Sequence, residues 1–129
     1  MTYTINRMFP DAGIDDVDAR ARKALTDHGF GILTEIDVKA TMKKKLDVEM
    51  PAYRILGACN PSMAWQALQA EDRIGTMLPC NVIVQQRDNG DVEVAAVDPV
   101  ASMQAVDNPG LARVASAVRD NLKNVIDSL

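Results

Sequence analysis

Residues 80–97, CNVIVQQRDNGDVEVAAV, hold two apolar runs separated by a polar turn sequence. The first run, Cys80–Arg87, is apolar on both faces at its centre, which is typical of a strand inside a sheet. The dipeptide Asn89-Gly90 tolerates the positive φ angles that a tight hairpin turn requires. Val92–Val97 is the expected return strand. The stretch therefore predicts an antiparallel hairpin, and this hairpin decides the fold class.

Three further strands are expected before the hairpin. Thr2–Phe9 alternates weakly and suits an edge strand. Tyr53–Cys59 alternates with Tyr53, Ile55, Gly57 and Cys59 on one face. Phe30–Lys39 also alternates, with Ile32, Thr34, Ile36 and Val38 on one face and Leu33, Glu35, Asp37 and Lys39 on the other. The expected sheet thus has five strands.

Helical spacing and capping residues predict the first helices. One is expected at about residues 15–28, capped by Asp15 or Asp16. Thr41–Leu46 predicts one or two helical turns, with Met42 and Leu46 facing inward. Asn60 and Pro61 are the residue types preferred at an N-cap and at the first helical position, so a helix is expected from there to about Ala70 or Ile74.

The C-terminal part adds a helical turn at Ala101–Val106 and a long last helix. Asn108 is its expected cap and Pro109 its first residue, and apolar residues recur at helical spacing as far as Leu129. This helix is expected to lie along the sheet. An antiparallel pair among mixed elements predicts one α+β domain over residues 1–129, a single mixed or antiparallel sheet with helices on one face.

Composition excludes several classes of function. The chain has 129 residues, a net charge of −4 and 4% aromatic residues, so Lys39, Lys43, Lys44 and Lys45 are interpreted as a solvated helix face. No apolar run approaches the ~20 residues that cross a bilayer, and the N-terminus lacks the pattern of a signal peptide. We therefore expect a soluble, cytoplasmic protein that binds neither nucleic acid nor membranes. Phosphate-loop, dinucleotide, zinc-protease and serine-hydrolase motifs are absent from the sequence.

Cys59 is the first candidate for chemistry. It ends an expected strand directly before an expected helix N-terminus, where the helix dipole and free backbone N–H groups favour the thiolate. The alternative is a structural role, in which Cys59 points into the core on the face of Tyr53, Ile55 and Gly57. Both interpretations stay open at this stage.

Cys80 is the second candidate, and each cysteine is followed by an asparagine, Asn60 or Asn81. The two asparagines are, with the two cysteines, candidate ligand-binding residues. If the two strands are antiparallel neighbours, Cys59 and Cys80 meet at one edge of the sheet. They could then form a reversible disulfide or supply two ligands to a soft metal. Two thiolates do not complete a zinc site, so carboxylates, water or a second subunit would have to supply the remaining ligands.

Other polar residues are weaker candidates. Glu35, Asp37 and Lys39 share one expected strand face and could form an acid/base or ligand-binding set, or simply a solvated face. His28, the only histidine, is interpreted as a partly buried residue that is satisfied by hydrogen bonds. Trp65 and the seven methionines are interpreted as core packing or a protein interface.

Four segments in order resemble one known family: GFGILTEIDVKAT at 29–41, ILGACNP at 55–61, IGTMLPCNV at 74–82 and AVDP at 96–99. Together they resemble the bacterial and archaeal family catalogued as domain of unknown function 302. The resemblance implies a TATA-binding-protein-like arrangement, strand–helix–four strands–helix, and a homodimer. It implies no activity and no cofactor, but its motifs include Cys59 and Cys80.

Three hypotheses on function follow. The first is a homodimeric binding module for a small ligand or a soft metal near Cys59 and Cys80. The second is a thiol-based redox or sulfur-handling enzyme, with Cys59 as the nucleophile and Cys80 as the resolving thiol. The third is a structural interaction domain with inert thiols.

Overall fold

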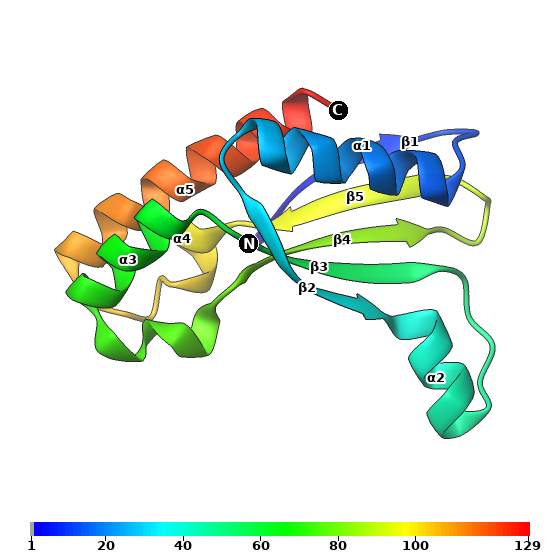
Figure 1. Cartoon of the computed structure of the whole chain (residues 1–129), viewed down its shortest axis with the longest axis horizontal. Helices are drawn as coiled ribbons and strands as arrows, with labels where there is room; N and C mark the ends of the chain where they lie inside the picture. Colours follow the sequence, from blue (N-terminus) through cyan, green and yellow to red (C-terminus); the bar gives the residue numbers. More distant parts are fainter. Residues whose placement is uncertain (1) are drawn as a thin grey trace.

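The computed structural model describes residues 2–129 as one five-stranded antiparallel sheet with helices (Figure 1). The strand order is β1-β5-β4-β3-β2. The strands are β1 Thr4–Phe9, β2 Gly31–Asp37, β3 Tyr53–Cys59, β4 Cys80–Gln86 and β5 Val92–Val97. The helices are α1 Ile14–Asp27, α2 Val38–Leu46, α3 Pro61–Ala70, the 3-10 helix η1 Asp72–Met77, α4 Pro99–Ser102 and α5 Pro109–Asp127. The predicted α+β class and the five strands are confirmed.

The hairpin of β4 and β5 forms where the sequence predicts it. Val84 lies opposite Val94, and Gly90 in the turn has a φ angle of 92°. Both strands are interior, because β4 also pairs with β3 and β5 also pairs with β1. Since apolar residues occupy both faces of β4, this strand is suited to the middle of the sheet.

Helices α1 and α5 cover one face of the sheet and enclose the main core (Figure 1). Alternate residues of β3, β4 and β5 point to this face, and Leu56, Val82 and Val94 among them are fully buried. From the helices, the core receives apolar residues at spacings of three and four, including Leu25 and Leu122. The last helix therefore lies along the sheet, as its periodicity predicts.

A second, smaller core lies beside the sheet. It consists of Ala67, Ile74, Met103, Leu111 and Ala115, which come from α3, η1, the end of α4 and the first half of α5. Asn108 holds these elements together, because its Oδ1 accepts hydrogen bonds from the N–H groups of Gly110 and Leu111 and its Nδ2 donates to the carbonyl of Ala70. The predicted cap of the last helix is therefore confirmed, and it also fixes the end of α3.

Several predicted helix ends are wrong. The N-cap of α1 is Gly13. Asp15 and Asp16 lie inside the first turn, where their negative charges interact favourably with the positive end of the helix dipole. The short helix before α5 is Pro99–Ser102 and not Ala101–Val106, because Asp98 caps it by accepting from the N–H groups of Val100 and Ala101.

Helix α2 also differs from its prediction. It begins at Val38 and extends beyond the sheet from the end of β2 (Figure 1). None of its residues is buried, and Leu46 is 66% exposed, so the expected inward pair of Met42 and Leu46 is wrong. Helices of this length are marginal in water without tertiary packing. Packing against the main core therefore does not account for the stability of α2.

A bulge in β2 changes the faces of that strand. Ile32 lies opposite Ala58 while Thr34 lies opposite Gly57, so Leu33 is an extra residue. Ile32 consequently points toward the core, whereas Thr34 and Ile36 share the opposite face, and the predicted single apolar face is wrong.

None of the helices among residues 2–129 is long and apolar enough to cross a membrane.

Candidate functional site

Cys59 ends β3 directly before helix α3, as predicted. Asn60 caps α3 by accepting a hydrogen bond from the N–H of Met63 at 3.2 Å, and Pro61 is the first helical residue. Cys59 is half-buried and lies on the face of β3 opposite to the buried Leu56 and Ala58. The interpretation that Cys59 points into the core is therefore wrong.

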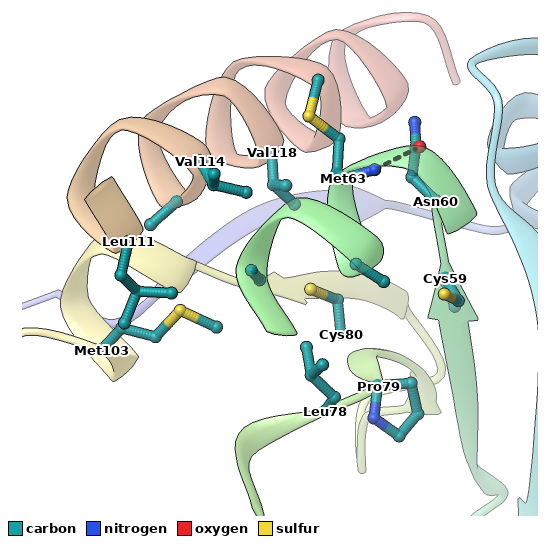
Figure 2. Close-up of a pocket in the computed structure, with 14 residues that line it drawn as sticks. Cys59, Asn60, Met63, Leu78, Pro79, Cys80, Met103, Leu111, Val114 and Val118 are labelled. Atoms are coloured by element: carbon teal, nitrogen blue, oxygen red, sulfur yellow. Dashed lines mark hydrogen bonds between the residues drawn. The ribbon is translucent and has the colours of Figure 1, made fainter. Parts of the chain in front are cut away.

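Cys80 begins β4, antiparallel to β3, and its register partner is Ala58. The predicted adjacency of the two strand ends is thus confirmed. Cys80 belongs to the main core and is 8% exposed, whereas Cys59 lies outside that core (Figure 2). Both cysteines are free. Burial in apolar surroundings, and to a smaller extent the charge of Cys59, raise the pKa of the Cys80 thiol to about 11.

A pocket lies at the junction of the two cores, between α3, α5 and the ends of β3 and β4 (Figure 2). Cys59, Asn60, Pro79 and Cys80 line the side formed by the strand ends. The rest of the wall is apolar and includes Met63, Leu78, Met103, Leu111, Val114 and Val118. The cavity volume is about 30 Å³.

Asn60 and Asn81 have different positions despite the matching Cys-Asn pairs. Asn60 lines the pocket, but its Oδ1 is used by the helix cap. Asn81 lies opposite Gly57, on the face of β4 away from Cys80, and is exposed. Only the first of these two candidate ligand-binding residues is therefore brought to the pocket.

The three polar candidates of the second strand do not form one set. Glu35 lies on the helix-covered face and forms an ion pair of 2.7 Å with Arg22 of α1. Asp37 caps α2 by accepting from the N–H of Ala40. Lys39 is a residue of α2, not of the strand, and donates to the carbonyl of Met50. The bulge and the early start of α2 separate the three residues from one another. None of them lines the pocket.

Glu35 belongs instead to a charge network around the buried Asp18, which the sequence did not reveal. Asp18 of α1 is only 7% exposed, and it accepts a 2.6 Å hydrogen bond from Nε of Arg22 and lies 3.4 Å from Nη1 of Arg54. The bond to Asp18 is the main reason that the pKa of Arg22 is raised. This network ties α1 to β2 and β3 and has no connection with the thiols.

Metal ligands are sparse around the thiols. Within residues 2–129, no group of three or more His, Cys, Asp and Glu side chains is arranged to hold a metal ion. The ring of His28 contacts the carbonyl of Ala24 at 2.8 Å, consistent with its interpretation as a hydrogen-bonded histidine, and it does not line the pocket. A metal at Cys59 and Cys80 would thus find no third His, Cys, Asp or Glu ligand among the described residues 2–129.

Most residues of the pocket wall were not predicted from the sequence. Met63 and Ala67 are spaced by four residues on α3, and Leu111, Ala115 and Val118 by four and three on α5. This spacing was visible, but it does not distinguish a pocket wall from ordinary core. Trp65, interpreted as core or interface, is 65% exposed and is therefore not part of the core.

Comparisons with known proteins agree with the fold. A search of curated proteins found no match. The crystal structure of an uncharacterized conserved protein DUF302 from Bacillus stearothermophilus is similar to this chain, with a TM-score of 0.90 and 22% sequence identity. The match covers 98% of each chain. The model of the family described as domain of unknown function DUF302 matches residues 6–129. The chain therefore belongs to the DUF302 family.

Proposed function

We propose that this protein is a homodimeric, non-enzymatic binding module whose site is the pocket beside Cys59 and Cys80. The observation that carries the proposal is an apolar pocket at the junction of two cores, lined by both cysteines. Ligand sites are typically apolar hollows with a few polar groups at defined positions. Here Cys59 and Asn60 line the pocket at the strand ends, beside an otherwise apolar wall.

The size of the pocket limits which ligand groups it can bind. Its volume of about 30 Å³ holds about two water-sized groups. A ligand would therefore insert only a small apolar end, such as a methyl group or the tip of an alkyl chain. Such a site retains a ligand by burying apolar surface and by contact with polarizable sulfur, and it needs no reactive group.

The state of Cys80 favours this function over a thiol enzyme. A resolving thiol acts as a thiolate, whereas burial raises the pKa of Cys80 to about 11 and so keeps it protonated at neutral pH. A protonated thiol in an apolar wall behaves as a small hydrophobic side chain. Cys80 is thus suited to line a binding pocket.

Xenon gas is a suitable first probe, because it enters small apolar cavities without needing polar contacts. With methyl-labelled methionines, we expect the NMR signals of Met63 and Met103, which line the pocket, to shift with xenon pressure. The signal of Met8, on the exposed sheet face, is the internal reference and should stay unchanged.

Ala64→Leu should remove most of the xenon shift, because the larger side chain fills the pocket that Ala64 lines. Ala112→Leu is the matched control, since Ala112 is exposed on α5 and does not line the pocket. The proposal fails if the Met63 and Met103 signals do not respond to xenon, or if Ala64→Leu leaves their response at the wild-type level.

The homodimer is the second part of the proposal, and α2 supports it. Leu46 and Val48, at and after the end of α2, are 66% and 47% exposed, and no residue of α2 is buried. Lys39, Lys43, Lys44 and Lys45 make α2 basic in a chain of net charge −4. Because the chain outside α2 is net acidic, contact of α2 with another part of a second copy would be electrostatically favourable. The free thiols of Cys59 and Cys80 are consistent with a cytoplasmic location, where thiols stay reduced.

Sedimentation of the wild-type chain should give a dimer at micromolar concentration, and Leu46→Ser should raise the dimer dissociation constant by about tenfold. The reason is the loss of about 1.5 kcal/mol or more from an apolar side chain that the dimer buries. Leu33→Ser is the matched control. Leu33 is as exposed as Leu46, but it lies near the start of β2, whereas α2 follows the end of β2. A monomeric wild type, or equal constants for the two variants, contradicts the assignment of α2.

A further inference from the structure

A second hollow adjoins the pocket. It is a surface groove of about 550 Å³ between α3 and α5. Met63 and Val114 line both the groove and the pocket, so the two spaces adjoin at these two residues. Figure 2 shows Met63 extending from α3 toward α5, beside Val114 and Val118. Because a methionine side chain is unbranched and flexible, it can move aside at low cost and connect the two spaces.

The groove is polar at its outer side and cationic. Gln66 and Gln69 of α3 and Arg113 of α5 line it, and Arg113 is exposed. Among residues 2–129, no carboxylate forms an ion pair with Arg113. In a chain with an acidic balance, the groove next to the apolar pocket thus carries a positive charge that is not neutralised. Arginine binds a carboxylate through two parallel N–H groups, and glutamine amides add further donors.

We propose that the ligand of this module is a single-chain amphiphile with an alkyl chain and a carboxylate head. The head lies at Arg113, Gln66 and Gln69, the chain runs along the groove, and its end passes Met63 and Val114 into the pocket beside Cys80. This inference rests on the proposed binding function and specifies its ligand. The small pocket takes only the end of the chain, and the larger groove takes the remainder.

Decanoate, below its micelle concentration, is the probe. We expect saturable shifts of the Met63 methyl signal and a dissociation constant that falls about fourfold for each methylene from hexanoate to decanoate. Arg113→Gln should weaken decanoate binding by about fivefold, the upper range for one exposed ion pair, and Arg113→Lys should recover part of the loss. Arg73→Gln is the matched control, because Arg73 is exposed in η1 and outside the groove.

The inference is overturned if decanoate binds Arg113→Gln and the wild type equally, or if decyltrimethylammonium binds as tightly as decanoate. It is also overturned if the Met63 signal depends on protein concentration without decanoate, because a second copy would then cover the groove. The xenon response of Met103 separates this failure from that of the proposed function. If xenon shifts Met103 while decanoate does not bind, the pocket stands and the amphiphile is rejected.

Discussion

We expect Gly57→Ala to lower the free energy of unfolding by about 2–3 kcal/mol, the upper range for overpacking a close contact. A Cβ atom at residue 57 would overlap Oγ1 of Thr34 and would stand 2.7 Å from Cγ of Pro79. Neither neighbour moves easily, because threonine is β-branched and the proline ring is rigid. The close approach of Thr34 and Pro79 also explains why Gly57 is buried, although it lies on the sheet face opposite to the main core.

Denaturant unfolding followed by circular dichroism measures this effect. Gly75→Ala is the matched control, because a Cβ atom at residue 75 meets nothing within 4 Å. We expect Gly75→Ala to change stability by less than about 1 kcal/mol, with a gain as the more frequent direction. Thr34→Ala should recover part of the loss when it is combined with Gly57→Ala, since it removes one of the two overlaps. Equal stability of Gly57→Ala and Gly75→Ala contradicts the packing of Pro79 over β3.

Gly57 also bears on the proposed site. Pro79 lines the pocket and directly precedes Cys80, so its position over Gly57 fixes where β4 begins. A displaced Pro79 would change the wall beside Cys80. The same substitution should therefore alter the methyl signal of Met103 under conditions in which the protein is still folded.

Features encoded by neighbouring residues could be predicted from the sequence. The hairpin follows from Asn89-Gly90 between two apolar runs, and the starts of α3 and α5 follow from Asn60-Pro61 and Asn108-Pro109. In each case the signal and its structural effect lie within a few residues of one another. The same local rule predicted that Cys59 precedes a helix N-terminus.

Features that depend on distant contacts could not be predicted. The bulge at Leu33 is defined by pairing with Ala58 and Gly57, and it reverses the face of Glu35 relative to simple alternation. For the same reason, the sequence could place Cys59 and Cys80 at one edge of the sheet but could not say which thiol enters the core. The pocket wall is harder still, because Met63 and Met103 become its lining only when α3 and α5 pack side by side.

The second large effect is expected at Cys80. In native protein at pH 7.5, iodoacetamide should modify Cys80 at least about 100-fold more slowly than in protein unfolded by urea. Burial raises the pKa of Cys80 from 9.0 to about 11. At a fixed pH below the pKa, each unit of increase in the pKa lowers the fraction of reactive thiolate tenfold. Mass spectrometry of the two cysteine-containing peptides measures both rates, with the half-buried Cys59 as the comparison in the same chain.

The same shift predicts how stability depends on pH. Because the folded state binds the Cys80 proton more tightly than the unfolded state, the contribution is fully present below about pH 9 and is lost as the pH rises toward about 11. A folded-state pKa about two above the unfolded value corresponds to about 3 kcal/mol of stability. Cys80→Ala should remove this part of the alkaline loss, whereas Cys59→Ser should change it little, since the charge of Cys59 is the smaller cause of the shift.

Fast modification of native Cys80 at neutral pH, together with an alkaline profile equal to that of Cys80→Ala, would instead identify an accessible thiolate. That result would favour thiol chemistry at the pocket over the binding module, because a reactive Cys80 is what a resolving thiol requires and what a buried wall residue cannot be.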